Sequence, residues 1–269
     1  MSEWKLQPEL LQYERLFGLI GYPLSHSFSK KYFSEKFERE GINYAFYELF
    51  PIEKIELFPG LIQNYPNLQG LNVTIPYKEA VMPYLDELEE SARAIGAVNT
   101  IKIADGKTKG FNTDVFGFEQ SLRAFFAKNN AQPDKALVLG TGGAAKAVQF
   151  VLEKMGMAHQ TVSRQASKGD LTYHDLDEAI LQEHRLIVNT TPLGMSPNIG
   201  SFPNIPYHCI GKKHMLYDLV YNPEMTAFLR KGKARGAATE NGLAMLYGQA
   251  ERAWAIWNDH SPAVATKLT

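Results

Sequence analysis

Short apolar runs alternate with segments of helical periodicity through the first half of the chain. Compact apolar runs are typical of buried strands, and they occupy residues 16–20, 44–50 and 70–74. Apolar residues recur at helical spacing over residues 29–40 and 87–95. Residues 97–103 and 108–112 flank Asp105 and Gly106, a dipeptide that favours a hairpin turn. Strands separated by helices predict a mostly parallel sheet.

A second alternating series follows Pro133. Its predicted strands are residues 136–139, 160–163, 186–189 and 215–218, and its predicted helices are residues 144–154 and 243–257. The last helix carries an apolar stripe on one face, as expected where a helix packs on a core. Two such series, with a candidate linker at residues 110–126, predict two domains with a small-ligand site in a cleft between them.

We therefore expect an α/β protein of two domains. Residues 1–105 form a substrate-binding domain with a mixed or parallel sheet, completed by a C-terminal helix that returns to it within residues 239–269. Residues 106–238 form the second domain. A chain of 269 residues is comfortable for two domains.

The composition excludes several classes of protein. With 28 basic and 29 acidic side chains the net charge is -1, which removes the footprint of a general nucleic-acid or membrane-surface binder. The single cysteine, Cys209, excludes an intramolecular disulfide, and the seven histidines show no pair at metal-ligand spacing, so we expect no metal site. No stretch approaches the ~18 apolar residues of a membrane span. The polar, acidic N-terminus lacks a signal-peptide core, so we expect a cytoplasmic protein.

A glycine-rich run joins the first strand of the second series to its helix. The run reads Gly140, Thr141, Gly142, Gly143, Ala144 and Ala145. The first glycine allows a tight turn, the second lets the backbone approach a pyrophosphate, and the helix N-terminus directs free N–H groups at it. A sharp strand-to-helix turn is the alternative, but the strand before the run and the helix after it favour nucleotide binding. We therefore expect residues 106–238 to be a Rossmann-type dinucleotide-binding domain.

The residue type at the end of the next strand distinguishes NAD from NADP. NAD enzymes place Asp or Glu there to bind the ribose 2′-hydroxyl. This chain has Ser163, followed by Arg164 and then Lys168, and two cations without a carboxylate suit the 2′-phosphate of NADP. The alternative is that both cations are solvated loop residues.

Further motifs occur in a fixed order along nearly the whole chain. They are residues 26–29 (HSFS), 72–78 (NVTIPYK), 96–100 (GAVNT), 112–114 (NTD), the glycine run, 189–195 (NTTPLGM), 217–223 (YDLVYNP) and 242–249. Each motif alone is weak evidence. Together, in this order and at compatible spacing, they resemble the shikimate dehydrogenase family.

One group of these residues suits a ring that carries several hydroxyls and a carboxylate. Its members are uncharged donors and acceptors, namely Ser27, Ser29, Asn72, Thr74, Asn99 and Gln249. Each buried hydroxyl left unpaired costs about 1–3 kcal/mol, so such a ligand needs such a lining. The alternative is that Asn72 and Asn99 satisfy turns and that Ser29 caps a helix starting at Lys30.

The resemblance implies roles for further residues. Lys78 and Asp114 match the proton-transfer pair of the family, and Tyr221 is similar to a tyrosine that contacts substrate. The positions around the nicotinamide are matched by Thr191, Leu219 and Gly242, and more weakly by Glu90. His26 is interpreted as a structural residue. The chain departs from the usual pattern at Lys30, Thr141, Ser163 and Gln165, none of which removes a group that the mechanism needs.

The resemblance implies reversible NADPH-dependent reduction of 3-dehydroshikimate to shikimate, in chorismate biosynthesis. It implies that the protein is a monomer or a homodimer. It also implies that the protein binds this small-molecule substrate and neither nucleic acid nor a membrane. The alternative, an NAD-preferring quinate/shikimate dehydrogenase, would have nearly all of the same site residues. Enzymes that use quinate tend to change one of the two hydroxyl-bearing residues of the first motif, whereas this chain has both serines. A non-catalytic NADP-sensing regulator is expected to lack Lys78 or Asp114, and both are present.

Overall fold

The structure is a computed structural model that describes residues 6–24 and 27–260. The chain forms two compact units, the first from residues up to Thr113 and from Ala250 onward, the second from Asp114 to Gln249. The sequence suggested divisions after residues 105 and 238. The structure divides later because residues 107–111 and 238–241 remain paired within the sheets of the first and the second unit, respectively. His26, interpreted as structural, lies outside the described residues.

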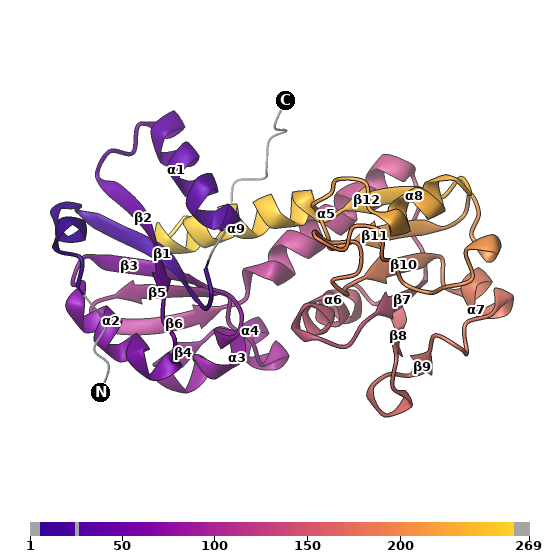
Figure 1. Ribbon diagram of the computed structural model, residues 1–269, viewed down its shortest axis with the longest axis horizontal. Helices are drawn as coiled ribbons and strands as arrows, with labels where there is room; N and C mark the ends of the chain where they lie inside the picture. The colour runs from indigo at the N-terminus through magenta and orange to yellow at the C-terminus, as the bar shows by residue number, and fades with distance from the viewer. Residues whose placement is uncertain (1–5, 25–26, 261–269) are drawn as a thin grey trace. The chain divides into compact units, whose positions relative to one another are not determined.

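The first unit contains a six-stranded mixed sheet, drawn in indigo to magenta in Figure 1. In the order β2-β1-β3-β5-β6-β4, β1 pairs in parallel with β2 and β3, and β5 is antiparallel to both β3 and β6. The predicted hairpin is confirmed, with Asp105 at φ 51° and Gly106 at φ 72° in its turn. The strands are β1 (Arg15–Gly21), β2 (Ala45–Pro51), β3 (Leu68–Val73), β4 (Glu87–Leu88), β5 (Thr100–Ala104) and β6 (Lys107–Phe111).

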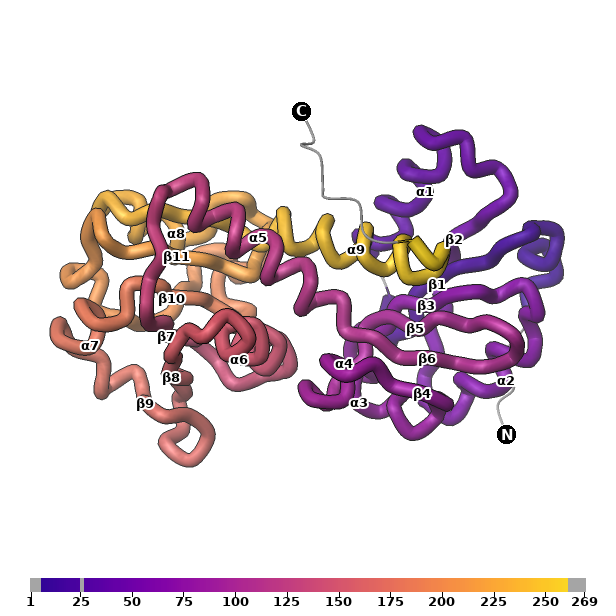
Figure 2. The backbone as a smooth tube through the Cα atoms, turned by 180° about the vertical axis from the view of Figure 1, so that it is seen from behind, coloured from indigo at the N-terminus to yellow at the C-terminus, as the bar shows by residue number. Residues whose placement is uncertain are grey.

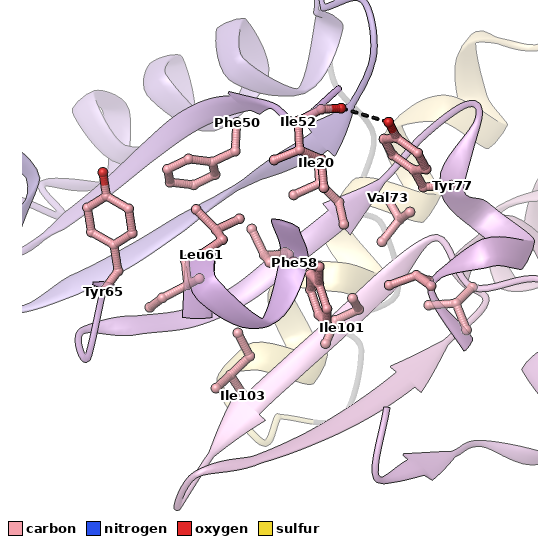
Figure 3. Packing of buried hydrophobic residues seen from close by; sticks show 14 of the residues in the cluster. Ile20, Phe50, Ile52, Phe58, Leu61, Tyr65, Val73, Tyr77, Ile101 and Ile103 are labelled. Carbon is pink, nitrogen blue, oxygen red and sulfur yellow. Dashed lines mark hydrogen bonds between the residues drawn. The ribbon is translucent and has the colours of Figure 1, made fainter. Parts of the chain in front are cut away.

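Side chains alternate across the first sheet, so each face has its own core. Ile20 of β1 joins a buried cluster with Phe58 on one face (Figure 3). Phe17 packs instead against Trp254 and Trp257, with ring centroids 5.4 and 4.9 Å apart. The C-terminal helix therefore completes the first unit, as predicted. The helices are η1 (Pro8–Gln12), α1 (Phe28–Glu40), η2 (Ile55–Leu57), α2 (Phe58–Asn64), α3 (Tyr77–Ala80), η3 (Met82–Tyr84), α4 (Glu90–Ile95) and α9 (Leu243–Trp257), which begins in the second unit.

Residues 87–95 are not one helix, and this prediction was wrong. The first two residues form β4, which pairs in parallel with residues 109–110 of β6. Glu89 then caps α4, because its side chain accepts a hydrogen bond from the Ser91 N–H at 2.9 Å. The open edge of β6 offers a backbone partner that the local pattern cannot reveal.

The second unit contains a six-stranded sheet whose strands pair in parallel, in the order β12-β11-β10-β7-β8-β9. The chain moves from β7 through β8 to β9 and then crosses to β10 on the other side of β7. This reversal is the topological switch point of a Rossmann-type sheet, where dinucleotides bind. The strands are β7 (Lys135–Leu139), β8 (Ala158–Ser163), β9 (Leu171–Thr172), β10 (Leu186–Asn189), β11 (Met215–Asp218) and β12 (Ala238–Asn241).

Residues 110–126 are not a linker, because β6 is followed directly by a long helix. Phe118 and Phe125 recur at helical spacing in this helix and pack edge-on against Tyr217 of β11, with ring centroids 5.2 and 6.1 Å apart. Figure 2 shows the next helix beside β7 and β8, with which it makes contact. The helices of this unit are α5 (Thr113–Asn129), α6 (Gly143–Lys154), η4 (Ala166–Lys168), α7 (Glu178–Glu183), η5 (Tyr207–Cys209) and α8 (Ala227–Lys233).

Candidate active site

Polar residues of the first unit meet at one edge of its sheet. Ser27 follows β1, Thr74 follows β3, and Asn99 precedes β5. The carboxyl ends of β1 and β3 share an edge because the two strands are parallel. The start of β5 lies at the same edge because β5 is antiparallel to β3, with Thr100 opposite Asn72. The fold thus gathers predicted substrate residues from three separate segments.

A buried hydrogen-bond network underlies this edge. The Tyr47 hydroxyl donates to Asn72 Oδ1 at 2.7 Å, and Asn72 Nδ2 donates to Thr100 Oγ1 at 3.2 Å. The Thr100 hydroxyl donates in turn to Asn99 Oδ1 at 3.2 Å, and this oxygen also accepts from the Thr113 N–H at 2.7 Å. All five residues are buried. Burial raises the pKa of the Tyr47 hydroxyl, so this group stays protonated and donates across the working pH range.

The network decides which polar atoms are left for a ligand. Asn99 Oδ1 accepts three hydrogen bonds from Thr100 and Thr113, which leaves Nδ2 as its outward group. Within residues 6–24 and 27–260, neither this nitrogen nor the Thr74 hydroxyl has a hydrogen-bond partner. Asn72 differs, because both its oxygen and its nitrogen are engaged inside the network. The structure therefore separates two asparagines that the sequence treated alike.

The two serines of the first motif have different surroundings. Ser27 is the N-cap of α1, and its Oγ accepts from the Lys30 N–H at 3.3 Å. Ser29 lies in the first turn of α1 and hydrogen-bonds Tyr47, which opposes the effect of burial on the pKa of that tyrosine. The alternative in which Ser29 caps the helix is therefore wrong. Both serines are half-buried.

Lys78 is positioned by the backbone around it. It is the second residue of α3, and its carbonyl oxygen accepts from the Val98 N–H at 2.7 Å. The preceding residue, Tyr77, is buried and donates its hydroxyl to the Ile52 carbonyl at 2.8 Å (Figure 3). These two hydrogen bonds, at Tyr77 and Lys78, fix the start of α3. The Lys78 side chain is half-buried.

The predicted nicotinamide-side residues follow the carboxyl ends of adjacent parallel strands. Thr191 follows β10, Leu219 follows β11, and Gly242 follows β12. Gly140 follows β7, so β7 and β10 place the glycine run and Thr191 on the two sides of the switch point. The carboxyl edge at a switch point is where open α/β sheets bind their ligands.

The glycine run fits a dinucleotide pyrophosphate. Gly140 has φ 113°, and a Cβ there would lie 2.7 Å from Thr190 Oγ1. Gly142 is the N-cap of α6 with no side-chain cap, and a Cβ at Gly142 or Gly143 would meet nothing within 4 Å. Both glycines are exposed and no side chain caps the helix, so its first N–H groups remain available to an anion. The remaining predicted residues of the run are Thr141, which is half-buried, and Ala144, which is exposed.

The end of β8 carries no carboxylate. Ser163 is buried there, and its Oγ accepts from the Gln165 N–H at 3.1 Å. Arg164 and Lys168 are exposed on the residues that follow. Because a guanidinium matches phosphate oxygens bidentately, this set suits a ribose 2′-phosphate better than a 2′-hydroxyl.

A buried carboxylate connects the ends of β10 and β11. Asp218 Oδ1 accepts from Asn189 Nδ2 at 2.9 Å and from the Val220 N–H at 3.1 Å, while Oδ2 accepts from Thr226 Oγ1 at 2.6 Å. Burial raises the pKa of Asp218 to about 6, and these hydrogen bonds oppose the rise. Asn189 Oδ1 accepts from the N–H and the hydroxyl of Thr191, at 3.1 and 2.6 Å.

The remaining predicted residues lie elsewhere. Three of them, Asp114, Tyr221 and Gln249, belong to the second unit. Tyr221 is 38% exposed. Gln249 Nε2 donates to a backbone carbonyl of its own helix at 3.0 Å. Glu90 is an exposed residue that opens α4 of the first unit, so it does not lie on the strand edge with the other predicted cofactor residues.

Sequence reasoning missed the residues that support the site. Tyr47 looks like an ordinary core aromatic of a strand, and no local pattern distinguishes it. Asn189 and Asp218 lie in recognised motifs but were given no role. Each is a polar residue that ends an otherwise apolar strand, and burial of such a group requires hydrogen-bond partners. That signal was available in the sequence.

The described part of the chain offers neither a metal-binding cluster nor a membrane-spanning helix. Residues 6–24 and 27–260 hold no group of three or more side chains able to bind a metal ion. The same residues form no helix long and apolar enough to cross a membrane.

Comparisons with known proteins agree with this geometry. A family model described as the shikimate dehydrogenase substrate binding domain matches residues 19–101, which lie within the first unit. The NADP-dependent shikimate dehydrogenase of Desulforamulus reducens is 37% identical over 267 residues, which cover 92% of this chain and 91% of the relative.

Solved structures share the whole fold. The shikimate 5-dehydrogenase of Thermus thermophilus, in complex with NADP(H) and shikimate, has a TM-score of 0.79 at 32% identity and covers 93% of this chain and 96% of its own. The quinate dehydrogenase of Corynebacterium glutamicum, in complex with NAD, has a TM-score of 0.83 at 28% identity and covers 94% and 96%. The matches extend over both units, and this chain belongs to the shikimate dehydrogenase family.

Proposed function

We propose that this protein catalyses the reversible NADPH-dependent reduction of 3-dehydroshikimate to shikimate, as a step of chorismate biosynthesis in the cytoplasm. One observation carries the proposal. The edge of the first sheet presents Thr74 Oγ1 and Asn99 Nδ2 without partners in the described chain, above a buried network in which Tyr47, Asn72 and Thr100 are hydrogen-bonded in series to Asn99 Oδ1. Such an edge suits a polyhydroxylated ring, because it supplies oriented polar groups with which the ring hydroxyls can pair.

The substrate residues divide into two kinds. We propose that Ser27, Ser29, Thr74 and Asn99 contact the ring substituents, together with Tyr221 and Gln249 of the second unit. Asn72 has its amide engaged by Tyr47 and Thr100, so its proposed role is to hold Asn99 and the end of β3 in place. This assignment refines the expectation that all the small polar residues contact substrate.

Lys78 and Asp114 are proposed as the proton-transfer pair. When bound, NADP supplies or accepts the hydride at the reacting carbon. A secondary alcohol that loses hydride must also lose its hydroxyl proton, so a positioned acid–base group is required. The half-buried ammonium of Lys78 holds that proton at Nζ in the ketone-reducing direction, and the Asp114 carboxylate orients it.

Residues of the second unit are proposed to hold the cofactor. The N–H groups at Gly142 and Gly143 bind the pyrophosphate, because they open a helix that no side chain caps. Arg164 and Lys168 bind the 2′-phosphate of the adenosine ribose. Thr191, Leu219 and Gly242 border the nicotinamide half, with Thr141, Ala144 and Ser163 beside the other half. Glu90, which matches the family's cofactor positions more weakly, is kept as an expected cofactor contact.

Initial rates test the proposal directly. The purified protein is assayed with shikimate and with quinate, each with NADP and with NAD. We expect shikimate with NADP to give the highest kcat/KM of the four combinations. A preference for quinate with NAD would replace the proposal by the quinate/shikimate alternative. Tight NADP binding without turnover of either substrate would indicate the non-catalytic sensor.

A further inference from the structure

The hydrogen bonds that run from Asp218 to Thr191 have a fixed direction. An ionised carboxylate only accepts, so Asn189 must turn its Nδ2 toward Asp218, at 2.9 Å. Its Oδ1 is then turned toward Thr191, and an amide oxygen also only accepts. The Thr191 hydroxyl must therefore donate its single proton to Asn189, at 2.6 Å.

Thr191 consequently has lone pairs but no proton for a ligand. Its Oγ1 accepts a long hydrogen bond from the Leu193 N–H at 3.4 Å, and its own proton is committed to Asn189. Asp218 is fully buried and is held by Thr226 and Val220 as well, so the direction of the chain of bonds is built into the core. The ordinary freedom of a threonine hydroxyl to donate or accept is removed.

The strand order identifies the part of the cofactor that Thr191 faces. The glycine run after β7 binds the pyrophosphate, and the residue at the end of β8 belongs to the adenosine ribose. The other half of a dinucleotide must then extend across the switch point onto the ends of β10 and β11, on the opposite side of β7 from β8. Thr191 lies at that end of β10. The nicotinamide ring carries a carboxamide, which offers both an N–H donor and a carbonyl acceptor.

We propose that Asp218, acting through Asn189, makes the Thr191 hydroxyl an obligate acceptor for the carboxamide N–H of the nicotinamide. Asp218 and Asn189 are positioning residues, and Thr191 is the contact. The inference rests on the proposed NADP-dependent function and adds a rule to it: the site selects cofactors that carry a hydrogen-bond donor at this position.

The test compares two cofactors that differ in one group. The 3-acetylpyridine analogue of NADP keeps the ring carbonyl but has a methyl group in place of the amide nitrogen. Equilibrium binding of the full chain to each oxidised cofactor is measured by titration calorimetry without substrate, because the analogue also has a different redox potential. We expect the wild-type protein to bind NADP about 3–10-fold more tightly than the analogue, the range for one net hydrogen bond.

Variants assign the preference to these residues. Thr191→Val removes the acceptor at nearly constant shape and should reduce the preference to about twofold or less. Asp218→Asn should also reduce it, because an asparagine can present either an oxygen or a nitrogen to Asn189. Thr108→Val is the matched control, since Thr108 likewise donates its N–H and hydroxyl to one side-chain oxygen, Asp86 Oδ2, but in the first unit. It should leave the preference unchanged.

Equal binding of both cofactors by the wild-type protein, or an undiminished preference in Thr191→Val, would overturn the inference. Thr191→Val decides this whether or not Asp218→Asn folds. A folded Asp218→Asn variant that kept the full preference would remove Asp218 from the account. Failure of the proposed function is a separate result, because it would appear as absence of shikimate-dependent NADP reduction by the wild-type protein.

Discussion

The two units prepare their binding edges by different physical means. In the first unit, neutral side chains hydrogen-bond one another beneath the edge, from Tyr47 through Asn72 and Thr100 to Asn99. In the second unit, the glycine run presents backbone N–H groups, and a buried charge, Asp218, hydrogen-bonds residues of the neighbouring loops.

This difference follows from the ligands. A ring with several hydroxyls needs donors and acceptors at fixed places, and only side chains provide such variety. A pyrophosphate is a uniform anion, so repeated N–H groups at a helix N-terminus suffice. The first unit should therefore be sensitive to side-chain changes, and the second to changes of backbone geometry and of charge.

The largest expected effect is at Lys78, because we propose that proton transfer depends on this one side chain. Lys78→Ala should lower kcat by about 10²–10⁴-fold, the usual contribution of a general acid–base group, and leave the Kd for shikimate within a few-fold. Steady-state rates and equilibrium binding of shikimate measure the two quantities. Lys31→Ala, a change at a lysine whose side chain is 77% exposed, is the control and should alter neither. Near-normal kcat in Lys78→Ala at neutral pH would remove Lys78 from the mechanism.

The buried charge of the second unit should make stability depend on pH. Because the pKa of Asp218 is raised to about 6 in the folded protein, folding favours its protonated form. Its contribution to stability is full below the unfolded pKa and is lost as pH rises through about 6, a change of about 3 kcal/mol. The free energy of unfolding of the wild-type protein should therefore fall relative to that of Asp218→Asn between about pH 4 and pH 7.

Denaturant unfolding of both proteins across this range measures the difference. Asp170 provides a control of opposite sign, because hydrogen bonds from the backbone and side chain of Thr161 lower its pKa. Its contribution is present above the unfolded pKa and is lost as pH falls. If the difference in the free energy of unfolding between the wild-type protein and Asp218→Asn stays constant with pH, Asp218 is not the titrating charge.

The glycine run should respond to a single methyl group. Gly140→Ala places a Cβ at φ 113°, 2.7 Å from Thr190 Oγ1 and 3.0 Å from Thr191 Cγ2. The strain of about 1–3 kcal/mol should weaken NADP binding on the order of tenfold or more and leave shikimate binding unchanged. Gly211→Ala is the matched control in the same unit, since a Cβ there meets nothing within 4 Å. Equal losses for both ligands in Gly140→Ala would mean that the whole fold is disturbed.

A smaller effect is expected from the network of the first unit. Tyr47→Phe leaves Asn72 Oδ1 without its buried donor, at a cost of about 1–3 kcal/mol in the free energy of unfolding. Because Asn72 then loses its fixed orientation, the KM for shikimate should rise a few-fold while the KM for NADP stays constant. Tyr65→Phe, which removes a buried hydroxyl that accepts from the Gln7 N–H at 2.8 Å, is the control. It should lower stability without changing either KM.

Much of the fold could be predicted because local patterns and global packing agree. The hairpin at Asp105 and Gly106, the helix that ends at Gly41 and the parallel strands of the second unit all follow from turn chemistry and apolar periodicity. The failures have a common cause. Residues 87–88 became a strand through pairing with a distant segment, and residues 113–129 are helical because their aromatic face packs on β11.

The sequence predicts the residues that are expected to contact a ligand, but it does not reveal the residues that support them. Thr74 and Asn99 were named from their motifs, and the structure leaves their polar atoms available in the part of the chain that it describes. Tyr47 and Asp218 act through neighbours that only the fold brings near them. Hydrogen-bond direction, in particular, is a property of a network and not of any one residue type.

Cofactor recognition at the end of β8 gives the most direct test of the whole account. With shikimate as substrate, the KM values for NADP and NAD are measured for the wild-type protein and for Arg164→Ala. One lost charge-assisted hydrogen bond is worth roughly 1.5–3 kcal/mol, so the KM for NADP should rise on the order of 10–100-fold while the KM for NAD stays nearly constant. Equal increases for both cofactors would contradict the account, because Arg164 would then support the loop or the adenine and not the 2′-phosphate.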